Sequence, residues 1–144
     1  MHLTKPIRIL LVEDNEGDIY LTLEAFKEGK FNNSIAVVRD GAEALQYLLK
    51  EEPYTNVEMP DLILLDINLP KMDGKEVLKV IKSHEILKSI PVIILTTSSS
   101  ETDIIDSYNG HANCYVIKPV KLETFLSVVR SIENFWISIV TLPR

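Results

Sequence analysis

Five short apolar runs, separated by amphipathic segments, constrain the fold of this chain more than any other feature. The runs are aliphatic and bounded by polar or turn residues, and they span residues 7–12, 35–38, 62–65, 92–95 and 115–117. Short runs that are apolar at nearly every position are typical of strands buried on both faces, as in a parallel sheet. We therefore expect five buried parallel strands.

The segments between the runs repeat apolar residues at helical spacing. Three of them carry clear patterns: Ile19, Leu23 and Phe26; Leu45, Leu48 and Leu49; and Val77, Leu78 and Ile81. A weaker pattern follows Ser98, which forms a capping-box signature with Glu101, and a long, strong pattern begins at Leu122. Strand followed by helix, five times over, predicts an α/β fold, a doubly wound parallel sheet with five helices on its two faces and right-handed crossovers.

Length and composition limit the class of protein. At 144 residues and 16.3 kDa the chain is one domain, residues 1–144, and its single cysteine excludes a disulfide framework. The formal charge of -6 argues against nucleic-acid binding, which needs a concentrated basic surface. Neither a secretory leader nor an apolar stretch long enough to span a membrane is visible. We expect a cytoplasmic protein with no membrane partner.

Polar side chains follow four of the five runs directly. Glu13 and Asp14 follow the first, Asp66 the third, Thr96 the fourth and Lys118 the fifth. Each residue alone would be an ordinary acid, hydroxyl or lysine. Because the carboxyl ends of parallel strands meet at one edge of a sheet, we expect all five to converge there on a shallow site.

The chemistry of such a site follows from its charges. Three clustered carboxylates repel one another, and a divalent cation together with the Lys118 ammonium would relieve this. Ligands that are all oxygen suit Mg²⁺. An ionised Asp66 can attack phosphorus and form an acyl phosphate. No phosphate-cradling glycine loop with lysine is present, so the phosphoryl group would come from a donor other than a bound nucleotide.

Taken in order along the chain, these residues and their neighbours resemble the response-regulator receiver domains of two-component signalling. The matching segments are 9–15, 61–70, 72–74, 91–96 and 115–119. The resemblance implies a flavodoxin-like (CheY-like) sheet of strand order 2-1-3-4-5. It also implies a signalling module rather than an enzyme, which receives a phosphoryl group from a sensor histidine kinase or a phosphotransfer protein and then changes conformation.

The resemblance assigns roles around the metal. Asp66 matches the phosphoacceptor, and Asp14 matches the acid that binds Mg²⁺ directly. Glu13 matches the acid that usually acts through water, and Asn68 the position whose backbone carbonyl completes the metal shell.

It also assigns the residues that would sense the phosphoryl group. Thr96 matches the switch hydroxyl, Lys118 the lysine that pairs with the phosphoryl group, and Tyr115 the aromatic switch. Lys118 and Pro119 match a cis peptide bond. The long loop at residues 52–60 and the absence of an output domain resemble a narrower group, the stand-alone receivers that are partners of bacterial phytochrome kinases.

The last helix, about residues 121–141, is longer than one domain normally covers. Its apolar stripe repeats every seven residues, as Phe125, Ile132 and Ile139 and again as Val128, Phe135 and Leu142. An exposed stripe of this kind implies a partner surface. We expect a two-fold homodimer through this helix; the alternative is a helix that folds back onto its own domain.

Other functions stay open at this point. An aspartate-nucleophile phosphatase would favour an acid at position 68, where this chain has Asn68. An FMN binder of the same fold would bring phosphate to the end of the first strand, where Glu13 and Asp14 repel it. A phosphorelay intermediate and an unphosphorylated docking module are the alternatives within the receiver class. Gly41 and Gly74 stand at helix starts, where we expect them to supply backbone freedom.

Overall fold

The structure is a computed structural model that describes residues 7–27, 33–97, 114–121, 123–124 and 127. The predicted fourth helix with its Ser98 cap, and nearly all of the predicted last helix with its dimer stripe, lie outside the described residues. In the part that is described, no helix has the length and apolar character needed to cross a membrane.

Helices and strands alternate along the chain. They are β1 (Ile7–Val12), α1 (Glu16–Lys27), β2 (Asn33–Val38), α2 (Gly41–Leu48), β3 (Leu62–Asp66), α3 (Gly74–Ser83), the 3₁₀ helix η1 (Leu87–Ser89), β4 (Val92–Thr96) and β5 (Cys114–Ile117). The five predicted strands and the first three predicted helices are confirmed. The short η1 was not predicted.

The five strands form one parallel sheet of order β2-β1-β3-β4-β5, as the resemblance implied. The register is continuous across the sheet: Val12 pairs with Val38 and with Leu65, Asp66 pairs with Leu95, and Thr96 pairs with Ile117. The carboxyl ends of all five strands therefore lie along one edge.

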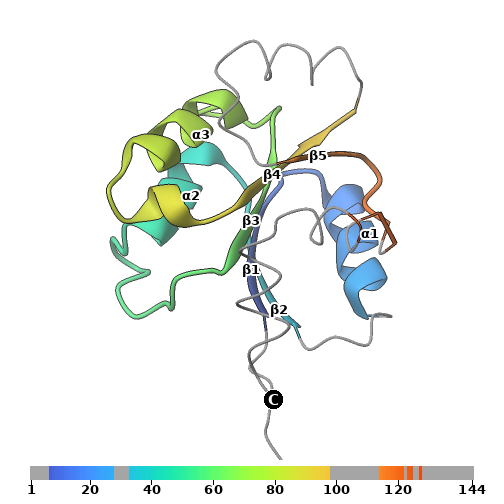
Figure 1. Cartoon of the computed structure of the whole chain (residues 1–144), viewed down its shortest axis with the longest axis horizontal. Coiled ribbons are helices and arrows are strands. Elements are labelled where there is room, and N and C mark those ends of the chain that lie inside the picture. Colours follow the sequence, from blue (N-terminus) through green and yellow to red (C-terminus); the bar gives the residue numbers. More distant parts are fainter. Residues whose placement is uncertain (1–6, 28–32, 98–113, 122, 125–126, 128–144) are drawn as a thin grey trace, which may run out of the picture.

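The sheet separates two apolar cores, with α2 and α3 on one face and α1 on the other (Figure 1). Successive strand residues alternate between them: Leu10 and Val12 belong to the α2–α3 core, whereas Ile9 and Leu11 pack with Phe26 of α1. Strands buried on both faces read as continuous apolar runs, which explains the pattern in the sequence.

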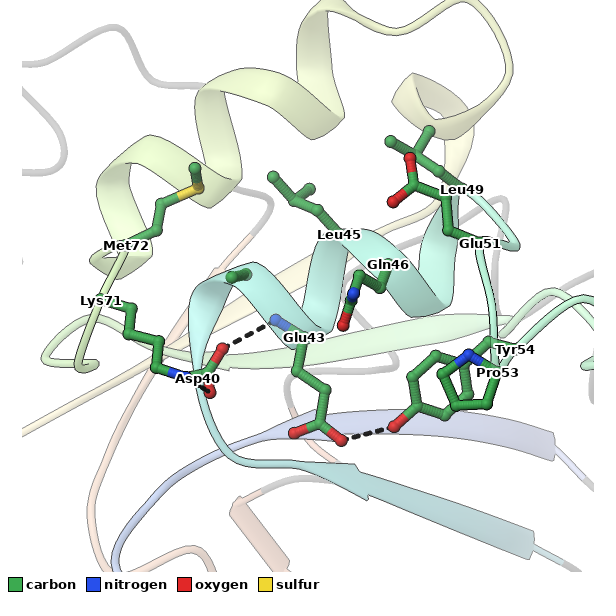
Figure 2. Close-up of a pocket in the computed structure, with 11 residues that line it drawn as sticks. Asp40, Glu43, Leu45, Gln46, Leu49, Glu51, Pro53, Tyr54, Lys71 and Met72 are labelled. Atoms are coloured by element: carbon green, nitrogen blue, oxygen red, sulfur yellow. Dashed lines mark hydrogen bonds and ion pairs between the residues drawn. The ribbon is translucent and has the colours of Figure 1, made fainter.

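Two acidic caps fix where the helices begin. Asp40 accepts a hydrogen bond from the Glu43 N–H at 2.7 Å and starts α2 directly after β2 (Figure 2). Asp73 and Glu76 form a reciprocal capping box at the start of α3. Such caps satisfy N–H groups that a helix leaves without partners, and they hold the loops after β2 and β3 in place.

The long connection between α2 and β3 is anchored at the opposite edge of the sheet. The Arg8 guanidinium donates through Nε to the Met59 carbonyl at 2.8 Å, and the Arg8 N–H donates to Asp61 Oδ2 at 2.9 Å. Five of the nine residues of the predicted loop at 52–60 are exposed, in agreement with a surface loop. Its Glu52–Pro53 peptide bond is cis.

The two glycines at helix starts are required by space rather than by backbone freedom, which corrects the expectation from sequence. Neither has a positive φ. A Cβ on Gly74 would lie 2.4 Å from the Asp66 carbonyl oxygen, and one on Gly41 would lie 2.0 Å from the Met72 carbonyl oxygen. The starts of α2 and α3 thus press directly on the backbone that follows β3.

Gly74→Ala should destabilise the fold by about 1–3 kcal/mol, because its Cβ meets backbone that can yield only by moving β3 or α3. The matched control is Gly17→Ala in α1, where the nearest neighbour of a new Cβ is a side-chain oxygen of Asn15 at 3.3 Å. That change should stay within about 1 kcal/mol of the wild type. Urea unfolding of both variants measures the difference, and equal stability of the two would contradict the close-approach explanation.

Candidate functional site

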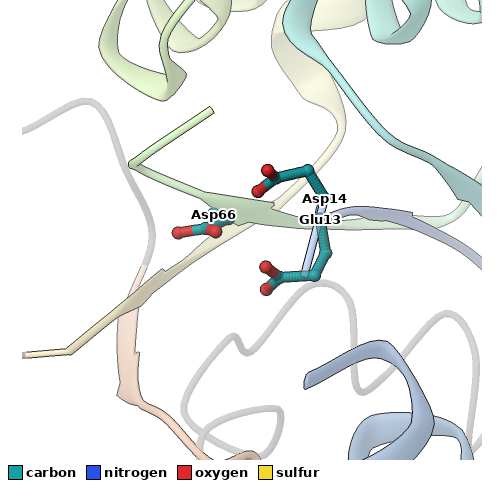
Figure 3. A group of neighbouring side chains, drawn as sticks. All are labelled: Glu13, Asp14 and Asp66. Carbon is teal, nitrogen blue, oxygen red and sulfur yellow. The ribbon is translucent and has the colours of Figure 1, made fainter. Parts of the chain in front are cut away.

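Three carboxylates meet at the carboxyl edge of the sheet. Glu13 and Asp14 follow β1 and Asp66 is the last residue of β3, so the pairing of these strands brings the three together (Figure 3). One oxygen of each lies within 4.8 Å of the others. Glu13 and Asp66 are 1% and 2% exposed, whereas Asp14 is open to solvent. The cluster thus has a buried base and an exposed mouth.

Lys118 supplies the positive charge of this cluster. Its Nζ lies 3.1 Å from Asp66 Oδ2, 3.3 Å from Glu13 Oε1 and 3.0 Å from Asp18 Oδ2. The Lys118 N–H donates to the Thr96 carbonyl at 2.8 Å, which keeps the lysine beside the end of β4. The peptide bond to Pro119 is cis, as the resemblance implied.

Backbone N–H groups hold the two buried carboxylates from the other side. The Asn68 N–H donates to Asp66 Oδ1 at 3.1 Å, and the Asn15 N–H donates to Glu13 Oε2 at 3.2 Å. Each buried acid is therefore oriented by one backbone donor and by Lys118. The backbone donor Asn68 N–H and the Lys118 ammonium thus hold the two oxygens of the Asp66 carboxylate separately.

Glu13 is buried and lies so close to another acid of the cluster that its pKa is raised. Burial, together with the hydrogen bond and negative charge of Asp66, raises the pKa of Glu13 to about 8, although Lys118 opposes the shift. Burial alone would lower the pKa of Lys118, but Asp18, Asp66 and Glu13 outweigh it and hold that pKa above its ordinary value. Lys118 therefore stays a cation, and burial beside Asp66 favours the protonated form of Glu13.

The remaining predicted site residues lie near this edge. Thr96 is fully buried at the end of β4, one residue beyond the partner of Asp66 in the sheet. Asn68 is exposed two residues after Asp66. Tyr115 of β5 is half-buried and packs against the core on the α2–α3 face. Glu13, Asp14, Asp66, Thr96 and Lys118 do converge, as the strand ends predicted.

Asp18 is a member of the site that the sequence did not indicate. It lies in the first turn of α1, where an acid is common because it complements the helix dipole. Its place in the site becomes visible only in the folded structure, where its carboxylate lies 3.0 Å from the Lys118 ammonium. A linear sequence carries no mark of that contact.

The donor set of the cluster suits a divalent cation. All candidate ligand atoms are oxygens, which hard ions such as Mg²⁺ prefer, and the negative charge exceeds what Lys118 alone neutralises. Asp14 at the exposed mouth leaves one side accessible, as expected for an ion that keeps part of its water shell. Glu13, Asp14 and Asp66 therefore fit a Mg²⁺ or Mn²⁺ ion.

One class of protein is defined by three features that this structure combines. They are a parallel sheet of order β2-β1-β3-β4-β5, an acid cluster at its carboxyl edge and a lysine directly after β5. The chain belongs to the response-regulator receiver domain family of two-component signalling, which residues 9–130 match.

Among its relatives is the response regulator Rcp1 of Synechocystis sp. (strain PCC 6803), 46% identical over 138 residues, which are 96% of this chain and 94% of Rcp1. The structure of Mn²⁺-bound Rcp1 aligns with a TM-score of 0.75 over 96% of this chain and 100% of that one.

Two further solved structures are similar. The phosphorylated cyanobacterial phytochrome response regulator RcpA is 49% identical with a TM-score of 0.77, over 97% of this chain and 100% of RcpA. The bacteriophytochrome response regulator RtBRR is 42% identical with a TM-score of 0.85, over 97% of this chain and 85% of RtBRR. The resemblance to receivers of the phytochrome type is thus confirmed.

In metal-free buffer, Glu13 should make the fold less stable as pH rises from 4.5 toward about 8. Across that interval folded Glu13 keeps a proton that unfolded Glu13 has released, so the folded state binds more protons and stability falls with rising pH. Lys118, with its pKa raised, is protonated in both states there and adds no slope.

Glu13→Gln removes this contribution, so the variant's stability should depend less steeply on pH than that of the wild type. Urea unfolding in EDTA at several pH values within the interval measures both slopes. Parallel curves for the two proteins would refute the assignment of a raised pKa to Glu13.

Proposed function

We propose that this chain is a single-domain response regulator that accepts a phosphoryl group on Asp66 from a phosphohistidine of a sensor histidine kinase or phosphotransfer protein. The observation that carries the proposal is the position of the Asp66 carboxylate. It is buried at the end of β3, 3.1 Å from the Lys118 ammonium and within 4.8 Å of Glu13 and Asp14. A buried carboxylate in such a setting is unusual unless it has a chemical role.

The transfer itself is a simple displacement. An oxygen of Asp66 attacks the phosphorus, the P–N bond to the donor imidazole breaks, and its electron pair stays on the imidazole nitrogen. The donor ring carries a proton on its other nitrogen, so it leaves as a neutral imidazole, and the product on this chain is an acyl phosphate on Asp66. Such reactions depend mostly on positioning and on neutralising charge. The backbone N–H of Asn68, which holds Asp66 Oδ1, supports the positioning.

Charge neutralisation would come from two cations. Asp14 and Asp66, Glu13 through water, and the Asn68 carbonyl would hold Mg²⁺, which when bound offsets the charge of the acids and the phosphoryl oxygens. Lys118 already lies against Asp66, so its ammonium would stay within reach of a phosphoryl oxygen. Thr96 ends the neighbouring strand, from which its hydroxyl would bind a second phosphoryl oxygen.

Phosphorylation would then act by a population shift. We infer that the phosphorylated state favours a conformer in which Thr96 and Tyr115 turn inward. The half-buried position of Tyr115, against the edge of the core, supports this role because a partly exposed ring can change its packing without opening the core. The change of conformation would alter the surface around Thr96 and Tyr115 and thereby the contacts of the protein with its partners.

The names of the relatives suggest the phosphoryl donor. RcpA and RtBRR are phytochrome response regulators, so we propose a histidine kinase of the phytochrome type as the phosphoryl donor, acting in the cytoplasm. We further propose that residues 1–144 act as one receiver domain that forms a homodimer through the helix at about 121–141. That helix lies outside the described residues, and its sequence pattern is the basis for the dimer.

Asp66→Asn should abolish phosphorylation, because an amide is a far weaker nucleophile than a carboxylate. Incubation with acetyl phosphate and Mg²⁺, followed by intact-mass measurement, should show one added phosphoryl group on the wild type and none on the variant. EDTA should suppress the wild-type adduct, since the acids and the donor would otherwise repel each other.

Asp61→Asn is the matched control, the same change just before the other end of β3, where the side chain meets Arg8. Its phosphorylation should equal that of the wild type. An adduct on Asp66→Asn would refute the assignment of the acceptor. Steady turnover of a generic phosphomonoester by the wild type would instead favour a phosphatase.

A further inference from the structure

A groove outside the acid cluster runs along α2. It has a volume of about 740 Å³ and is bounded by α2, by the loop that follows it and by the loop between β3 and α3 (Figure 2). We call it the α2 groove. The residues that decide its chemistry are three acids and three apolar side chains: Asp40, Glu43, Glu51, Leu45, Leu49 and Met72.

The floor of the α2 groove is apolar. Leu45 and Met72 are partly buried, and each packs with one side against the core between the sheet and α2–α3. Leu49, at the end of α2, keeps 38% of its surface exposed. A short apolar segment of a partner would remove this surface from water, which is favourable.

The walls of the α2 groove are acidic. Three carboxylates face a single lysine, Lys71, which lies 3.5 Å from Asp40 and compensates that acid. Glu43 accepts hydrogen bonds from the Tyr54 hydroxyl and from the Arg39 N–H, neither of which carries a charge. The Arg39 guanidinium also lies within electrostatic reach of Glu43, but it forms its ion pair with Glu16 at 2.9 Å. Lys71 is the one cation among the residues that line the groove, so the lining keeps an excess of negative charge.

The Tyr54 hydroxyl holds the Glu43 side chain in place on the wall of the groove. Its hydrogen bond to Glu43, helped by burial and by the negative charge of Glu43, raises the pKa of the Tyr54 hydroxyl to about 12. Tyr54 thus keeps its proton throughout the physiological range and remains the donor to Glu43. The ring of Tyr54 also packs against Tyr47 at a centroid distance of 5.1 Å, which holds the loop against α2.

We infer that the α2 groove is a docking site for a short amphipathic segment of another protein, with lysine or arginine on one face and aliphatic side chains on the other. Charge complementarity selects this occupant: acidic walls repel nucleic acid and anionic lipid, and they disfavour a second copy of a chain whose own charge is -6. The aliphatic face would cover Leu45, Leu49 and Met72, while the basic face would pair with Glu43 and Glu51.

The test uses the full, unphosphorylated chain, so its outcome does not depend on the role of Asp66. The probe is a synthetic amphipathic peptide of leucine and lysine, compared with a matched peptide in which glutamate replaces every lysine. Amide NMR spectra recorded during titration locate the contact and give the affinity. We expect the lysine peptide alone to shift amides of residues 40–54 and 71–72.

Glu51→Lys should weaken the lysine peptide roughly three- to tenfold, because it turns an attractive charge into a repulsive one at an exposed position. Glu123→Lys makes the same charge change at an exposed position outside the groove and should leave the affinity unchanged. Leu49→Ser should also weaken binding, because it removes apolar surface that the aliphatic face of the peptide would cover, and unchanged affinity would contradict the inference. Urea unfolding of each variant separates loss of binding from loss of folding.

Several results would overturn the inference. These are shifts confined to other surfaces, equal binding of the glutamate peptide, and equal weakening by Glu51→Lys and Glu123→Lys. Shifts of the same amides with protein concentration alone, before any peptide is added, would identify a second copy as the occupant and would also refute it.

Discussion

A single ammonium group holds the carboxyl edge of this sheet together. Lys118, which directly follows β5, contacts the carboxylates of Glu13 after β1, Asp18 in α1 and Asp66 in β3, and each of these contacts joins segments that are far apart in the sequence. Two of those carboxylates are almost fully buried, a condition that proteins tolerate only when the charge is paired. The pairing remains incomplete, since Lys118 carries one charge against at least three. The shortfall is what gives the site its affinity for a further cation or a proton.

Much of the fold could be predicted because it depends on local patterns. Strands buried on both faces must be apolar at nearly every position, so the sequence shows them directly. The short η1 was missed because Leu87–Ser89 is too brief to show a period. The packing of Gly41 against Met72 was missed because it depends on the path of two backbones that are distant in sequence.

The candidate site divides in the same way. Glu13, Asp14, Asp66, Thr96 and Lys118 were predicted to converge because parallel strands share an edge, and topology alone carried that argument. Asp18 could not be found, since an acid in a first helical turn has an ordinary explanation. The roles of Asn68 and Tyr115 rest on family resemblance, because neither residue type at its position implies a chemistry. The α2 groove could not be predicted from the sequence, because it is formed where α2, the loop that follows it and Met72 come together in the folded chain.

The close contacts of Gly41 and Gly74 have a consequence for how this family would be compared across species. At both positions a side chain would meet backbone atoms at less than 3 Å, and both border the segment that follows Asp66. In an alignment they would appear as invariant as a reacting group, although they touch no reactant. Invariance at these two alignment positions would therefore reflect close helix packing. A ranking of residues by invariance alone would class these structural glycines with the residues that react.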